Sequence, residues 1–303
     1  MYLVTHTSPD WDAIGYVWLM RRWGGAGKDA EIRFVNTANP DPEVLAGAYS
    51  VGDTGRVFDP AILRFDHHQL PGRESNELCA TLMAYEWLAA QNNTPEREAT
   101  RQELEAIHKI IGLIYQGDTG ARNAETEASS RIGIHALLAT RLKRGESDEA
   151  LVAWGCAVLD DLADLAIARK ASARLLHSYT TWRSMDGLIV ALKDAPREAT
   201  SAAFEAGAMF VFFSSEDRGS FARGVQRGRS ENALPHAGEL IGLAAEATSH
   251  PGVTAELRQW YLHPAGFFAG RGTAKAPCYE PMTCDIADIA IEFSRMCFRT
   301  LGE

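Results

Sequence analysis

The chain has 303 residues, with 30 basic and 40 acidic side chains and a formal charge of −10. Its composition, 46% hydrophobic and 23% charged, is ordinary for a soluble globular protein and excludes a disordered, collagen-like or coiled-coil chain. The acidic balance disfavours tight binding of long duplex DNA, because a polyanion is bound by basic surface. The length predicts two domains.

No segment predicts a membrane span or a secretory signal. The longest strongly apolar run, 208–213, is far shorter than a membrane span, and the polar pair Thr5-His6 follows Met1 too closely for a signal peptide. The five cysteines are scattered without zinc-site spacing, so we expect them to be reduced and structural. A cytoplasmic protein without a membrane partner is therefore expected.

The first half of the chain alternates short strands with amphipathic helices. The predicted strands are Tyr2–Thr5, Glu31–Val35, Ala48–Val51 and Arg64–Phe65. The predicted helices are Trp11–Trp23, Leu78–Ala90 and Pro95–Tyr115. This alternation predicts an α/β fold, with a mostly parallel sheet flanked by helices in an N-terminal domain over residues 1–145.

The second half predicts a helical connector and a smaller α+β domain. Residues 146–185 are rich in Ala and Leu, and the acidic residues Asp160, Asp161 and Asp164 are expected to form a solvated helix face. Over 186–303 the predicted strands are Leu188–Leu192, Met209–Phe213 and Ser220–Val225, and the predicted helices are Ala237–Ala247 and Cys284–Phe298.

Four polar segments lie at the ends of predicted elements, where open α/β sheets build ligand sites. Their imidazoles and carboxylates are His6, Asp10, Asp12, Asp53, Asp66, His67, His68 and Asp118. Taken alone, each segment also fits an ordinary polar turn or a hydrogen-bonded core histidine. Their order and their shared place at element ends favour a common site.

These residue types indicate a particular class of metal. Carboxylate oxygens and imidazole nitrogens suit Mn²⁺, Mg²⁺ or Fe²⁺. The four carboxylates of Asp10, Asp12, Asp53 and Asp118 repel one another, and two divalent cations would neutralise their charge. Such a pair lowers the pKa of a bridging water and stabilises an in-line phosphoryl displacement. This charge argument does not assign ligands to individual ions.

At these segments the chain resembles the DHH phosphoesterase superfamily. The family's motifs His-x-x-x-Asp-x-Asp-Ala, an isolated Asp, Asp-His-His, and an Asp before Thr match residues 6–13, Asp53, 66–68 and Asp118-Thr119. Phe65, Gln69 and the segment 79–86 also match the surroundings of the Asp-His-His signature. The resemblance extends from residue 1 to about residue 122.

The resemblance implies two divalent cations, Mn²⁺ or Mg²⁺, and a ligand set for each. The first cation would be held by His6, Asp10 and Asp53. The second would be held by Asp12, Asp53, His67 and Asp118, with Asp53 bridging the two. His68 would face the scissile phosphate as a hydrogen-bond donor or acid, and Asp66 would orient its neighbours.

A fainter resemblance covers the C-terminal part. Arg223 and the His263-Pro264 loop resemble the substrate domain associated with DHH proteins, although Tyr261-Leu262 replaces the usual glycine pair and Phe267-Phe268 enlarges the loop. The neighbouring Gly-Arg-Gly-Thr-Ala-Lys turn, with Arg271, Thr273 and Lys275, is a second candidate anion site.

The sequence therefore predicts a metal-dependent hydrolase, in which a hydroxide activated by two metals attacks a phosphodiester or phosphomonoester. The expected substrate is a short single-stranded oligonucleotide, a dinucleotide or a nucleotide. An inorganic pyrophosphatase-like activity and a non-catalytic nucleotide-binding sensor are the alternatives. A homodimer is also considered.

Overall fold

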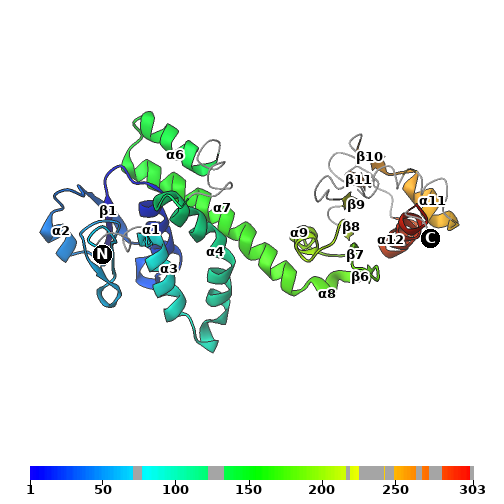
Figure 1. Ribbon diagram of the computed structural model, residues 1–303, viewed down its shortest axis with the longest axis horizontal. Coiled ribbons are helices and arrows are strands. Elements are labelled where there is room, and N and C mark those ends of the chain that lie inside the picture. The colour runs from blue at the N-terminus through cyan, green and yellow to red at the C-terminus, as the bar shows by residue number, and fades with distance from the viewer. Residues whose placement is uncertain are drawn as a thin grey trace. The chain divides into compact units, whose positions relative to one another are not determined.

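The computed structural model describes residues 1–70, 77–121, 133–215, 219–224, 242, 249–263, 268–272 and 282–300. The chain divides into two compact units, Met1–Ile167 and Ala168–Glu303. Each unit combines a sheet with helices, so the predicted mixed α/β fold is confirmed (Figure 1).

The first unit contains a five-stranded, mostly parallel sheet in the order β2-β1-β3-β5-β4. Its strands are β1 (Tyr2–His6), β2 (Glu31–Val35), β3 (Ser50–Gly52), β4 (Phe58–Asp59) and β5 (Arg64–Phe65). Of the strands that the structure describes in this unit, only β4 runs antiparallel to its neighbour, β5, and the sequence analysis did not predict β4. The parallel pairing of β1, β3 and β5 brings their carboxyl ends to one edge of the sheet.

The first unit also contains helices that pack on the sheet or on one another. They are α1 (Trp11–Arg22), α2 (Pro42–Ala46), α3 (Ala80–Gln91), α4 (Glu98–Asp118), α6 (Ile134–Lys143) and the first part of α7 (Asp148–Arg174). Helix α1 contacts both α3 and α4, and Figure 1 shows these helices side by side. Every residue of α1 from Trp11 to Met20 is buried, so this helix forms the centre of the unit's core.

Helix α7 differs from the predicted connector. Its residues Leu151, Val152, Leu159 and Ala163 are buried in the core of the first unit. The unit boundary therefore lies inside α7, after Ile167, rather than at residue 145. The expected solvated face is also partly engaged, because Asp160 and Asp164 form ion pairs with Arg22 of α1.

The second unit contains a six-stranded sheet in the order β10-β11-β9-β8-β7-β6. Its strands are β6 (Thr180–Arg183), β7 (Ile189–Lys193), β8 (Phe210–Ser215), β9 (Gly219–Gly224), β10 (Tyr261–Leu262) and β11 (Phe268–Arg271). Its helices are α8 (Leu176–Tyr179), α9 (Glu198–Glu205), α11 (Pro251–Leu257) and α12 (Ile286–Thr300). Among the described strands of this sheet, only β7 and β8 pair in parallel, which agrees with an α+β unit.

The two faces of this second sheet pack into separate clusters. Phe212 and Phe293 belong to the cluster that includes α12, whereas Phe213 packs with residues of α9. The predicted helix Ala237–Ala247 lies outside the described residues, apart from residue 242. Within the described part of the chain, no helix has both the length and the apolar character needed to cross a membrane.

Candidate metal centre

The turns that follow β1, β3 and β5 carry the predicted site residues. His6 ends β1, Asp53 follows β3, and Asp66 follows β5. The register places Val4 beside Val51 and Gly52 beside Phe65, so the three turns are neighbours at one sheet edge. The sequence analysis predicted a site at the strand ends because it expected parallel strands, and β1, β3 and β5 do pair in parallel.

A first donor cluster consists of His6, Asp10 and Asp53. The Nε2 atom of His6 lies 3.0 Å from Asp53 Oδ2 and 3.9 Å from Asp10 Oδ1. The Nδ1 atom of His6 lies 2.7 Å from the backbone oxygen of Thr7. Since that oxygen can only accept, Nδ1 carries the proton, which leaves Nε2 as the atom suited to bind a cation.

A second donor cluster consists of Asp12, His67 and Asp118. The Nε2 atom of His67 lies 4.0 Å from Asp12 Oδ2 and 3.7 Å from Asp118 Oδ2. Asp118 is the last residue of α4, so this helix delivers its carboxylate to the sheet edge. Three elements distant in sequence thereby contribute to one cluster.

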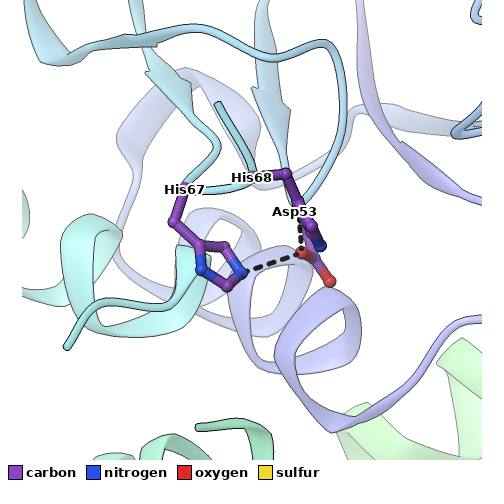
Figure 2. A group of neighbouring side chains, drawn as sticks. All are labelled: Asp53, His67 and His68. Carbon is purple, nitrogen blue, oxygen red and sulfur yellow. Dashed lines mark ion pairs between the residues drawn. The ribbon is translucent and has the colours of Figure 1, made fainter. Parts of the chain in front are cut away.

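Asp53 belongs to the first cluster and also forms a third group of donors with His67 and His68, so it links the first cluster to His67 of the second. Its Oδ2 faces His6, and its Oδ1 lies 3.7 Å from His67 Nε2 and 3.7 Å from His68 Nδ1. Figure 2 marks the ion pairs that join both of the latter histidines to this carboxylate. Asp53 is 2% exposed and has a φ of 56°, a left-handed conformation that non-glycine residues seldom adopt. Local strain of this kind occurs often at functional sites.

Asp12 is fixed by the start of α3. The backbone N–H groups of Ala80 and Thr81 donate to its two carboxylate oxygens, each at 2.7 Å. The hydroxyl of Thr81 donates to the backbone oxygen of Asp12 at 2.8 Å. A helix N-terminus favours a negative charge, so this contact holds a fully buried carboxylate in place.

Asp10 is held in a similar way by the helix that it begins. Its Oδ1 accepts hydrogen bonds from the N–H groups of Asp12 and Ala13 in the first turn of α1. As the N-cap, Asp10 both starts the helix and keeps its carboxylate beside His6.

Asp66 orients His68. Asp66 Oδ1 accepts from the His68 backbone N–H at 2.9 Å and lies 2.7 Å from the His68 ring Nδ1, while Oδ2 accepts from the Arg56 N–H at 2.7 Å. With both oxygens engaged, Asp66 is placed to position the imidazole. The His68 side chain is 44% exposed, unlike that of its neighbour His67 at 8%.

The pKa values reflect a crowded acidic site. Burial, reinforced by the charges of Asp10 and Asp53, raises the pKa of Asp118 to about 6. Burial and neighbouring carboxylates also raise the pKa of Asp12 well above its usual value. Burial opposes the charged form of His6, but the hydrogen bond and charge of Asp53 outweigh it and raise the His6 pKa to about 9.

Hydrogen bonds set the direction of the pKa shifts of Asp53 and His68. Burial raises the pKa of Asp53, but interactions with His6 and His67 outweigh this effect and lower it far below the usual range. The hydrogen bond to Asp66 raises the pKa of His68 against a smaller opposing effect of burial. Asp53 is thus a stable anion and His68 is favoured as a protonated donor.

The donor set fits hard or borderline divalent cations. Each cluster offers only imidazole nitrogens and carboxylate oxygens whose donor atoms lie within 4.8 Å of one another. Within the described part of the chain these clusters include no thiolate, which fits Mn²⁺, Mg²⁺ or Fe²⁺. The carboxylates are mutually repulsive, so divalent cations would relieve an electrostatic cost that the fold otherwise bears.

The residues of the second unit that were predicted to contact substrate differ in how exposed they are and in whether their charge is already paired. Arg223 is exposed on β9, and His263 follows β10. Arg271 is 3% exposed and its guanidinium pairs with the fully buried Glu256, so its charge is already balanced within the protein. Thr273 and Lys275 lie outside the described residues.

The structure adds a supporting contact that the sequence analysis missed. The backbone N–H of Ser8 donates to Asp148 Oδ1 at 2.9 Å, across 140 residues of chain. Ser8 has a φ of 54° and lies between His6 and Asp10, so this bond holds the strained turn that carries two site residues. No local pattern around Asp148 indicates this role.

A comparison of the chain with models of known protein families finds no match, and neither does a comparison with curated proteins.

Proposed function

We propose that the protein is a divalent-metal-dependent phosphoesterase with a DHH-type arrangement of its first unit. The observation that carries the proposal is the shared carboxylate of Asp53, whose two oxygens face His6 and His67 of separate donor clusters. This arrangement suits a pair of cations joined by one carboxylate. When bound, the cations would polarise a phosphoryl oxygen and lower the pKa of a water molecule.

The chain's own residues would divide the remaining work. His6, Asp10, Asp53, Asp12, His67 and Asp118 would hold the cations. His68 is exposed beside the cluster, and Asp66 fixes its ring and favours its protonated form. It would donate a hydrogen bond to a phosphate oxygen and help neutralise negative charge that develops there.

The described residues give less support to the alternatives. A pyrophosphatase requires several cationic side chains to hold two phosphates, and Arg271 is already paired with Glu256. A sensor that had lost catalysis would not need an oriented His68 beside a complete set of carboxylate and imidazole donors. The substrate remains a phosphate ester of a nucleotide, dinucleotide or short oligonucleotide in this proposal.

The test is a panel of phosphomonoesters, phosphodiesters, short oligonucleotides and pyrophosphate, assayed with Mn²⁺. Wild type should hydrolyse at least one ester, and Asp118→Ala and His67→Ala should lose that activity while retaining their fold. Asp161→Ala, which removes an exposed carboxylate from α7, is the matched control and should remain active. Equal turnover by wild type and both site variants would refute the proposal.

A further inference from the structure

A cavity of about 190 Å³ adjoins the metal centre within the first unit. Three of its lining residues, Asp10, Asp12 and Asp118, are also donors of the two clusters. Its apolar lining includes Ile114, Leu138 and Leu142. The cavity therefore joins an acidic part, which carries the candidate cation donors, to a part lined mainly by apolar side chains.

Trp11 contributes a second sign that this cavity receives a ligand. Trp11 lines the cavity and is 3% exposed. Its indole Nε1 is buried and has no hydrogen-bond partner among the described residues. Leaving a buried donor unpaired costs free energy, so such a group in a cavity lining suggests an additional partner when a ligand is bound.

The cavity also depends on a glycine of α4. A Cβ atom at Gly117 would lie 2.1 Å from the Nε2 of His135, another lining residue, on α6. Only a residue without a side chain lets His135 of α6 approach this turn, next to Asp118. The geometry thus couples the cavity lining to a residue of the metal centre.

We propose that this cavity binds the organic group of the substrate, a neutral, flat group about the size of a single ring, while the ester's phosphate is held at the metal centre. This inference rests on the proposed function. Because the cavity shares residues with the donor clusters, a group inside it is close enough to be bonded to a phosphate held there.

Charge and size define the kind of group. Hydrocarbon walls and neighbouring carboxylates both oppose a second phosphate, so the cavity selects esters over pyrophosphate. Its volume is below the roughly 300–1,000 Å³ of pockets that hold drug-sized ligands, which favours one ring over a complete nucleoside. A planar ring can bury both faces against the apolar side chains.

The test compares the binding of phenylphosphonate and methylphosphonate by calorimetry in the presence of Mn²⁺. The two probes carry the same phosphonate and differ only in the organic group. Wild type should prefer phenylphosphonate by roughly tenfold or more, because the ring leaves water for an apolar cavity. The P–C bond of both probes resists hydrolysis, which keeps the binding measurement independent of turnover.

Ala139→Phe is the decisive variant. Ala139 lines the cavity but is exposed on α6, so a phenyl side chain can enter the space without displacing buried core. The preference should fall to about twofold or less, with methylphosphonate binding unchanged. Ala153→Phe, the same change at an exposed position of α7 outside the cavity lining, should keep the preference. Leu142→Phe fills the same cavity if the first variant fails to fold.

Each outcome separates the two proposals. Loss of the preference in Ala139→Phe alone supports the cavity as the ring site. Equal binding of both phosphonates by wild type, binding of neither, or a preserved preference in the cavity-filling variants overturns the cavity proposal and leaves the phosphoesterase proposal standing, because that proposal is tested by turnover. Absence of turnover of every ester in the panel overturns both.

Discussion

Replacing Asp118 with asparagine should change the protein's stability in opposite directions with and without metal. The pKa of Asp118 is about 6 in the folded protein, against an ordinary value of 3.8. Below pH 3.8 the carboxyl is protonated in both the folded and unfolded states, so it does not lower the free energy of unfolding. As pH rises towards 6, the unfolded chain loses its proton first, so the folded state becomes less stable.

The size of this effect follows from the pKa difference. At about 1.4 kcal/mol for each pKa unit the shift corresponds to about 3 kcal/mol, and solvent screening of the partly exposed Asp118 reduces the loss in free energy of unfolding to about 1–3 kcal/mol above pH 6. Asparagine has a similar size and no charge, so metal-free Asp118→Asn should be more stable than wild type by about 1–3 kcal/mol at pH 7.5. At pH 5 the gain should be about half as large.

With saturating Mn²⁺ the order should reverse, because the variant lacks a charged ligand and gains less from metal binding. Urea unfolding at pH 5 and pH 7.5, each in chelator and in Mn²⁺, measures the difference in free energy of unfolding between wild type and Asp118→Asn under the four conditions. Asp161→Asn, an exposed site on α7, controls for the loss of one negative charge. The reasoning is refuted if metal-free Asp118→Asn is no more stable than wild type at pH 7.5.

Three further substitutions probe the supports of the site. Asp66→Asn should lower turnover about 100-fold and shift the pH dependence of turnover, because Asp66 no longer orients a protonated His68. Its metal content should stay unchanged, and loss of metal would contradict an orienting role. Asp148→Ala removes the bond to Ser8 and should weaken Mn²⁺ binding roughly tenfold in a metal titration, whereas Glu149→Ala on the same helix turn should not. Gly52→Ala would place a Cβ atom 2.3 Å from the buried ring of Tyr16 and should destabilise the fold by about 1–3 kcal/mol in urea unfolding. Gly112→Ala, which meets no atom within 4 Å, should be neutral or stabilising, and equal losses in both variants would refute the packing argument.

Local patterns in the sequence predict much of the first unit. The strand Glu31–Val35 has the expected bounds, and the helix predicted over Trp11–Trp23 spans Trp11–Arg22. Polar residues after apolar strands indicated where the site lies, because parallel strands end at one edge of a sheet. The place of Asp53 at the carboxyl end of a strand could therefore be predicted from the local sequence alone.

Details that depend on long-range packing were not predictable in this way. The anchoring of Asp12 by Ala80 and Thr81 joins segments 68 and 69 residues apart. The left-handed backbone of Asp53 arises from the surrounding turn, and no residue type in the sequence demands it. Short elements such as α2 and β4 also carry too few residues to show a periodic pattern.

The second unit illustrates the same limit for charged residues. The glycines around Arg271 favoured an anion site, since the local sequence contains no acidic partner. The partner, Glu256, lies 15 residues earlier in α11 and meets Arg271 only when β11 is in place. Likewise, the Ala- and Leu-rich start of α7 gave no sign that it would complete the core of the first unit.

The proposed sharing of Asp53 by two cations is tested most directly by electron paramagnetic resonance of the Mn²⁺-loaded 303-residue chain, together with its metal content. We expect two Mn²⁺ per chain with the magnetic coupling of ions that share a carboxylate, and loss of that coupling in Asp53→Ala. A single Mn²⁺ per chain, or two uncoupled ions in wild type, would contradict the proposed centre.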